Sequence, residues 1–276
     1  MVSPKGRRRS PRVLTSLAFL YTVSGVSLDK MIPLSDSTAP PLIIERAGEV
    51  MTFTLNNVAD GNRISGPMLD TMLAELKQPA SARSARVLRI RARGKVFCTG
   101  RERKGHDVAT LHHEAARIIE VKRFLRTSSL ITVAEVHGDA LGFGFGLAIL
   151  CDFVLVAEHA RLGFPEMHSA LPPSAIMAYL GEYTLPRFAF PLVLFGDPID
   201  PAFAKQIGLI SQVCLASSLA GEVDTLVDRI LALDAAAVRR CKEFFQTAQQ
   251  NTFDQNCRLA IETLTVSSLN VLAPEK

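Results

Sequence analysis

The spacing of apolar residues predicts strands in the first part of the chain. Five short apolar runs indicate strands, at residues 42–46, 50–55, 87–93, 130–136 and 153–157. The first two are joined by Ala47-Gly48-Glu49, which predicts a β-hairpin. The run at 130–136 is mostly apolar and β-branched, which is typical of a strand that is buried on both faces.

Between these strands the apolar spacing becomes that of a helix. A helix is predicted to start near Ser65-Gly66-Pro67, a long amphipathic helix to run from His113 to Leu125, and a third helix to begin at the glycines of 142–146. Strands that alternate with helices indicate βαβ crossovers and a largely parallel sheet. After Pro173 helical patterns dominate, at residues 176–180, 202–207, 219–233, 236–249 and 254–268.

Composition allows one large core and argues against a nucleic-acid partner. Of 276 residues, 48% are hydrophobic and 21% are charged, so the chain can bury a large core as one domain. The formal net charge is +4, but five of the 31 basic residues lie within the first twelve positions. The remainder holds 26 basic and 27 acidic residues, and we expect no basic stripe that would bind nucleic acid.

Residues 1–35 predict a disordered or targeting-like extension. Basic residues are followed there by an apolar run at 13–20 and small residues at 24–27, as in a targeting peptide, although a true start near Met31 explains the same pattern. No segment is long enough to span a membrane, so no membrane partner is expected. Five widely spaced cysteines, without a CxxC pair, indicate a reducing compartment. We expect a cytoplasmic protein, with an organellar or exported form left open by the extension.

Chemistry first appears at a glycine-rich turn. In HGDALGFGFGLAILCD (residues 137–152), Gly142, Gly144 and Gly146 stand where a buried strand gives way to a helix, although an interior glycine weakens a helix by roughly 1 kcal/mol. Backbone N–H groups at such a position lack intrahelical partners and can bind negative charge. Three interpretations are open: a dinucleotide site, whose GxGxxG spacing is not met, an oxyanion hole, or close backbone packing.

Two further stretches favour the oxyanion hole. Residues 96–102 place Gly100 shortly after a strand, where a second backbone N–H would be available. Glu166 follows Pro165 in apolar surroundings, where burial would raise the pKa of its carboxyl toward that of a working acid or base. The run His112-His113-Glu114 lacks metal-ligand spacing, so no metal site is predicted.

In this order, the three stretches resemble the crotonase family, the enoyl-CoA hydratase and isomerase superfamily. The similarity runs from about Pro41 to the C-terminus and is strongest over residues 131–172, with lesser marks at 97–100, 202–210 and 44–55. The resemblance implies an α/β fold of repeated ββα units over residues 36–200 and a helical C-terminal region, 201–276, that mediates homotrimers or hexamers. It also implies an acyl-CoA substrate, with coenzyme A as part of the substrate and no separate cofactor.

The resemblance also implies roles for individual residues. The backbone N–H groups of Arg101 and Phe143 would form the oxyanion hole, and Phe143 replaces a common family glycine. The residues expected along the substrate and its coenzyme A are Arg101, Glu102, Arg103, Lys104, Gly142, Phe143, Gly144 and Gly146. Of three positions that hold acids in the family, the first is Gly146 here, the second is Glu166 and the third is Ser174, so one carboxylate remains.

That single carboxylate leads to a hypothesis for the reaction. Adding water across a double bond in one step uses an acid and a base, whereas moving a double bond from the 3 to the 2 position needs one group that takes a proton from C2 and returns it at C4. We therefore expect a single-glutamate 3-enoyl-CoA to 2-enoyl-CoA isomerase with Glu166 as its catalytic acid and base. Two alternatives stay open: a hydratase or related lyase with a second acid such as Asp139 or Glu102, and a non-catalytic acyl-CoA binder.

Overall fold

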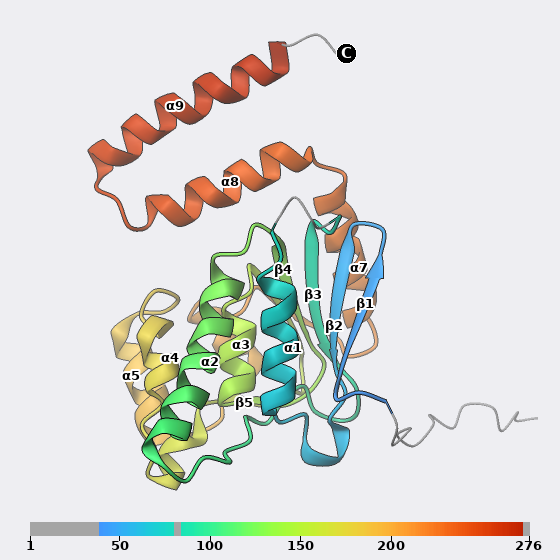
Figure 1. The fold of residues 1–276 in the computed structure, drawn as a ribbon, viewed down its shortest axis with the longest axis vertical. Coiled ribbons are helices and arrows are strands. Elements are labelled where there is room, and N and C mark those ends of the chain that lie inside the picture. Colours follow the sequence, from blue (N-terminus) through green and yellow to red (C-terminus); the bar gives the residue numbers. More distant parts are fainter. Residues whose placement is uncertain (1–38, 80–83, 273–276) are drawn as a thin grey trace, which may run out of the picture. The chain divides into compact units, whose positions relative to one another are not determined.

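The main sheet begins with the predicted hairpin. The computed structural model describes residues 39–79 and 84–272. Strands β1 (Leu42–Ala47) and β2 (Val50–Leu55) pair antiparallel, and Gly48 in the turn between them has a φ of +56°. Within the described residues, β3 (Val87–Ala92), β4 (Ile131–Val136), β6 (Phe153–Ala157) and β8 (Gln212–Cys214) extend this sheet in parallel, in the order β1-β2-β3-β4-β6-β8. Figure 1 shows β1, β2, β3 and β4 side by side in this sheet. The predicted strands and the largely parallel sheet are confirmed.

Helices cover both faces of this sheet. α1 (Gly66–Leu76), α2 (Val108–Arg126) and α3 (Phe143–Ile149) contribute to the larger hydrophobic core, and α7 (Leu219–Leu231) contributes to a second core on the opposite face. Neighbouring residues of β4 enter different cores, because successive side chains of a strand point to opposite faces. All six residues of β4 are buried, which explains its apolar sequence.

Side-chain caps set where the helices start. Ser65 accepts a hydrogen bond from the N–H of Met68 at 3.4 Å, and α1 begins where it was predicted. α2 begins at Val108, earlier than the predicted His113, because the Asp107 carboxylate accepts a hydrogen bond from the N–H of Thr110 at 2.9 Å.

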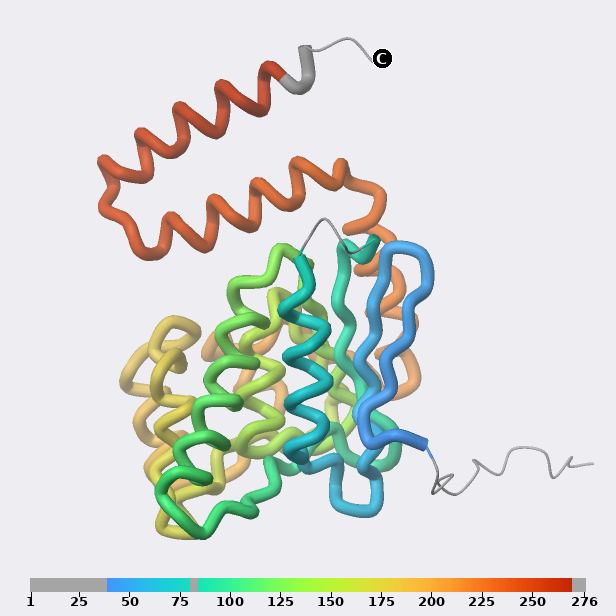
Figure 2. Tube along the Cα trace, in the orientation of Figure 1, coloured from blue at the N-terminus to red at the C-terminus, as the bar shows by residue number. Residues whose placement is uncertain are grey.

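The C-terminal part is mostly helical, as expected, but it also adds a strand. Its helices are α4 (Ser174–Leu180), α5 (Pro186–Phe195), α6 (Pro201–Gln206), α7, α8 (Ala235–Ala248) and α9 (Phe253–Leu272). α5 was not predicted, since Pro191 lies inside it and proline disfavours helix interiors. β8 was also missed because three residues are too few to show a strand period. Figure 2 shows α8 and α9 as a helical hairpin.

A buried lysine joins α8 to the sheet. Lys242 Nζ donates hydrogen bonds to the carbonyl oxygen of Leu130 at 2.5 Å and to Asp152 Oδ2 at 2.6 Å. The same carboxylate oxygen accepts from the N–H and the hydroxyl of Thr132, at 2.7 and 2.8 Å. This network attaches the helical hairpin to the start of β4 and the end of α3.

Two further predictions concern the N-terminal extension and membrane-spanning segments. The extension predicted at residues 1–35 lies outside the described residues, so the structure says nothing of it. Of the helices that are described, none has both the length and the apolar character needed to cross a membrane.

Candidate active site

A small second sheet brings the three predicted stretches together. β5 (Ala140–Leu141) pairs in parallel with β7 (Leu162–Gly163), and Cys98 forms a bridge with Ala140 on the other side. The N–H of Leu141 donates to the Cys98 carbonyl, and the N–H of Gly142 donates to the Gly163 carbonyl, both at 2.8 Å. Segments far apart in sequence therefore meet at the first residue of α3.

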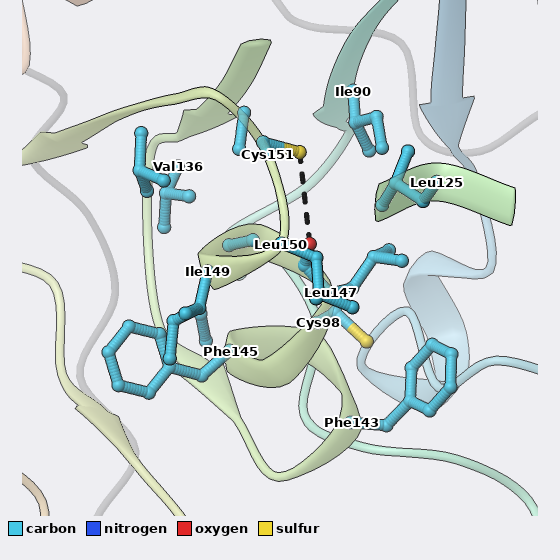
Figure 3. Packing of buried hydrophobic residues seen from close by; sticks show 14 of the residues in the cluster. Ile90, Cys98, Leu125, Val136, Phe143, Phe145, Leu147, Ile149, Leu150 and Cys151 are labelled. Carbon is cyan, nitrogen blue, oxygen red and sulfur yellow. Dashed lines mark hydrogen bonds between the residues drawn. The ribbon is translucent and has the colours of Figure 1, made fainter. Parts of the chain in front are cut away.

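The glycines of this turn serve two different contacts. Gly142 precedes α3 with a φ of +52°, and a Cβ atom there would lie 2.7 Å from Glu166 Oε1. A Cβ atom at Gly144 would overlap the carbonyl oxygen of Cys98, so close backbone packing explains this glycine. The intervening phenylalanine rings, Phe143 and Phe145, point to opposite sides of α3 (Figure 3).

Two backbone N–H groups are available where the oxyanion hole was expected. Phe143 is the first residue of α3, so its N–H has no partner within the helix. Gly100, with a φ of +133°, precedes Arg101, whose neighbours on both sides hydrogen-bond to Ile64 through the Gly100 carbonyl and the Glu102 N–H. Among the described residues, neither the N–H of Arg101 nor that of Phe143 has an acceptor. Such donors can hold an oxygen that gains negative charge.

Glu166 lies on the one-turn helix η3 (Pro165–Ser169), directly after Pro165. The residue is half-buried, and its Oε2 is buried without a hydrogen-bond partner among the described residues. Burial raises the pKa of the Glu166 carboxyl, and its own backbone N–H, Lys122, Arg103 and Arg101 oppose that rise. A carboxyl group whose pKa is raised is a stronger base than an ordinary glutamate and can accept a proton and give it back.

The cleft in front of Glu166 holds five of the predicted residues. It has a volume of about 810 Å³, and its lining includes Arg101, Arg103, Gly142, Phe143 and Glu166. The turn before α3, the segment that holds Arg101 and Arg103, the middle of α2 and η3 thus contribute to one concave site. A cleft with convergent polar groups and a titratable residue of shifted pKa is typical of an active site.

Other predicted residues lie outside this cleft. Glu102 and Lys104 line a smaller neighbouring hollow and form an ion pair with each other at 2.7 Å. Gly144 and Gly146 are buried within α3 and do not line the cleft. Asp139, considered as a second acid, accepts a hydrogen bond from the N–H of Arg161 at 2.9 Å and is also absent from the cleft lining.

Basic side chains near the cleft are partly neutralised. Arg101 Nη1 lies 3.7 Å from a Glu114 oxygen, and burial lowers the pKa of its guanidinium. Arg103 is exposed. Arg63, which no sequence motif marks, lines the cleft with it and pairs with Asp60. A third position discussed for the family, Ser174, begins α4 and also lines the cleft.

Sequence reasoning also missed Lys122 and Tyr179. Lys122 lines the cleft, and its Nζ donates a hydrogen bond to the Tyr179 hydroxyl at 2.9 Å. The signal was present in α2, where Lys122 falls among the apolar positions Ile118, Val121 and Leu125, which are all buried. A charged residue on the apolar face of an amphipathic helix indicates an unusual environment.

Comparison with known proteins points to one protein family. The family described as "Enoyl-CoA hydratase/isomerase" matches residues 45–268. A 2,3-dehydroadipyl-CoA hydratase of Escherichia coli (strain K12) is 31% identical over 180 residues, which cover 62% of this chain and 68% of the relative.

Solved structures share the fold. An enoyl-CoA hydratase of Mycobacterium smegmatis is similar with a TM-score of 0.80 and 25% identity, covering 86% of this chain and 93% of that one. A Thermobifida fusca YX protein in complex with CoA is similar with a TM-score of 0.78 and 27% identity, covering 84% of this chain and 94% of the other.

Proposed function

Because the chain belongs to the enoyl-CoA hydratase/isomerase family, the crotonase superfamily, we propose that this protein is an isomerase that converts 3-enoyl-CoA to 2-enoyl-CoA. One observation carries the choice of reaction: of the described residues that line the cleft, Glu166 alone is acidic. The position of the family's other glutamate is Gly146, where a Cβ atom would overlap the Ile176 side chain and lie 2.7 Å from the Tyr179 hydroxyl.

The proposed reaction is two proton transfers around an enolate. The thioester oxygen accepts hydrogen bonds from the N–H groups of Arg101 and Phe143. The Glu166 carboxylate takes a proton from C2, and the electron pair of that C–H bond moves into the conjugated system, giving a dienolate with its charge on the thioester oxygen, C2 and C4. Protonated Glu166 then gives the proton to C4, which leaves the double bond between C2 and C3.

Coenzyme A enters as part of the substrate, and the proposed reaction uses no other cofactor. We propose that Arg103, which is exposed at the cleft, binds the phosphates of coenzyme A, whereas Arg63 is paired with Asp60 and Lys104 with Glu102. Support comes from the Thermobifida fusca YX protein of the same fold, which is in complex with CoA.

The C-terminal helices are proposed to form a homotrimer or hexamer. Several apolar side chains of α9 are more than half exposed in the single chain: Phe253, Ile261, Leu264, Val266 and Leu269. Exposed apolar patches of this kind mark protein interfaces. Light scattering coupled to size-exclusion chromatography measures the assembly, and a monomer would contradict this part of the proposal.

Product analysis tests the reaction. Purified protein is incubated separately with 3-enoyl-CoA and 2-enoyl-CoA of several chain lengths, and the products are identified by mass spectrometry. The proposal predicts that the 3-enoyl substrate becomes its isobaric 2-enoyl isomer. A mass gain of one water on the 2-enoyl substrate would instead support a hydratase with a second acid. Binding by isothermal titration without turnover of either substrate would indicate an acyl-CoA-binding protein.

A further inference from the structure

Lys122 is a buried cation on the wall of the cleft, in contact with neutral groups. Lys122 is 3% exposed, and its Nζ donates hydrogen bonds to the Tyr179 hydroxyl at 2.9 Å and to the Ala175 carbonyl at 3.2 Å. Nζ also lies 4.8 Å from the ring centre of Tyr179 and 5.4 Å from that of Phe143. An ammonium has three protons, so two described acceptors leave one for a group in the cleft.

The lysine occupies the space beside Gly146. A Cβ atom at this glycine would lie 3.2 Å from Lys122 Nζ and 2.7 Å from the Tyr179 hydroxyl. The Tyr179 hydroxyl in turn donates to the Gly146 carbonyl at 2.8 Å, which fixes the position of the Lys122 acceptor. The volume next to residue 146 is therefore filled by a positive group from α2 and its tyrosine partner.

Glu166 and Lys122 lie beside two positions of the α3 segment, Gly142 and Gly146, that are about one helical turn apart. The N–H of Gly146 donates to the Gly142 carbonyl at 3.0 Å, so the two glycines are separated by just over one turn, about 6 Å along the axis. Glu166 Oε1 is next to the position of a Cβ atom at Gly142, and Lys122 Nζ is next to that at Gly146. A carbon chain whose C2 meets Glu166 is thus within reach of the ammonium at its following atoms.

The two groups also influence each other's charge. Burial lowers the pKa of the Lys122 ammonium to about 7, Glu166 opposes this shift, and Arg101 adds to it. Lys122 in turn opposes the burial that raises the pKa of Glu166. Burial raises the pKa of Tyr179 well above its usual range, so the hydroxyl stays neutral beside the lysine. The Glu166 carboxylate and the Lys122 ammonium therefore favour each other's charged form.

We propose that Lys122 is a second catalytic residue, whose ammonium faces C3 and C4 of the substrate and stabilises the negative charge that forms when Glu166 removes the C2 proton. This role rests on the proposed function, and it makes Lys122 an electrostatic partner that keeps its own protons. The oxyanion N–H groups stabilise the charge at the thioester oxygen, and the lysine stabilises it at the C4 end.

The test is the pH profile of kcat for 3-enoyl-CoA isomerisation. Glu166 must be ionised, so the rate rises with pH on the acid side. Lys122 must be protonated, so the rate of the unsubstituted protein falls as pH rises through about 7. In Lys122→Met this basic limb disappears, the acid limb moves to higher pH because Glu166 loses a nearby positive charge, and kcat falls about 10²-fold with a smaller change in KM.

Two further variants separate a catalytic from a structural role. Lys205→Met, which changes an exposed lysine of α6, serves as the matched control and keeps the profile of the unsubstituted protein. Tyr179→Phe removes the hydroxyl acceptor while keeping the ring, and we expect it to move the basic limb to lower pH because the ammonium loses a partner. This variant tests the proposal even where Lys122→Met fails to fold. A basic limb that is absent from the unsubstituted protein, or retained in Lys122→Met, would overturn it.

Deuterium uptake at C2 keeps this inference separate from the proposed function. The exchange of C2 protons in D₂O reports enolate formation by Glu166 whether or not C4 is protonated. Isomerisation without a Lys122-dependent limb overturns the role of the lysine and leaves the proposed function intact. Exchange that carries this limb but yields no isomer overturns the isomerase and supports Lys122.

Discussion

Two buried lysines of this chain show how different partners indicate different roles. Lys242 on α8 contacts a carboxylate, Asp152, which is itself held by the N–H and hydroxyl of Thr132. Lys122 on α2 contacts a tyrosine hydroxyl and a carbonyl oxygen and lines the cleft that holds Glu166. The charge of Lys242 is neutralised by a carboxylate of the protein. The ammonium of Lys122 can still donate a hydrogen bond to a negatively charged group of a bound ligand.

This difference explains why we propose a catalytic role for Lys122 and a structural role for Lys242. A buried charge is costly unless it is paired, so a lysine in an ion pair stabilises the connection that it makes. A buried lysine whose described hydrogen-bond partners are neutral, beside a carboxylate of raised pKa, has the properties of a catalytic group.

Substitution of the two carboxylates near these lysines is expected to give the largest difference in isomerisation rate. Glu166→Gln removes the only acid that lines the cleft among the described residues, and we expect the isomerisation rate to fall by about 10³-fold or more. Asp152→Asn is the matched variant beside Lys242, and its rate per folded molecule should stay near that of the unsubstituted protein. Steady-state kinetics measures both. Full activity of Glu166→Gln on every acyl-CoA that the protein turns over would show that Glu166 is not the catalytic group.

Removal of the structural lysine should change stability and leave the pH profile unchanged. Lys242→Met leaves Asp152 with its Thr132 donors only, and we expect the free energy of unfolding to fall by about 2 kcal/mol, less than for a fully buried pair because Asp152 is partly exposed. Urea unfolding followed by circular dichroism measures this loss. If Lys242→Met removed the basic limb of the rate profile instead, the distinction between the two lysines would be wrong.

A single added methyl group tests the packing around Lys122. In Gly146→Ala the new Cβ atom would overlap Ile176 and press on Tyr179 and Lys122, and we expect a loss of about 1–3 kcal/mol in stability. The basic limb should also move, because the ammonium and its acceptor are displaced. Gly181→Ala is the control, since no atom lies within 4 Å of its added Cβ. Equal stability of the two variants in thermal unfolding would contradict the described packing.

The weakest expected effect concerns coenzyme A. Arg103→Gln removes an exposed cleft-lining charge, and we expect KM for the acyl-CoA to rise by about tenfold with a small change in kcat, as for a group that binds substrate and transition state alike. Arg187→Gln, an exposed arginine of α5 outside the cleft lining, is the control. An unchanged KM across a range of salt concentrations would exclude Arg103 from coenzyme A binding.

The sequence was sufficient for the regular part of the fold. Strands β1 to β4 and β6 were predictable because each is an apolar run bounded by turn residues, and the start of α1 because Ser65 and Pro67 mark it. Elements that go against local preference were not predictable. α5 contains Pro191, and β8 gains its strand conformation by pairing with β6 rather than from its own residues.

In the candidate site, the residues that lie in short sequence motifs were predictable, and the others were not. Glycine turns and Glu166 are visible as short motifs, and the structure places Arg101, Phe143 and Glu166 around one cleft. Lys122 lies in no motif, because its role depends on contacts with Tyr179, more than fifty residues later, and on the space beside Gly146. Glu102 and Lys104 turn to a neighbouring hollow because they pair with each other, a contact that residue order alone does not determine.

The central claim is that one carboxylate moves a proton from C2 to C4 without adding water. Its most direct test is a single-turnover reaction with 3-enoyl-CoA that carries deuterium at C2, analysed by mass spectrometry and NMR. We expect a 2-enoyl-CoA product with deuterium at C4. A product that is heavier by one water, or an isomer whose C4 takes its new hydrogen from the solvent alone, would contradict it.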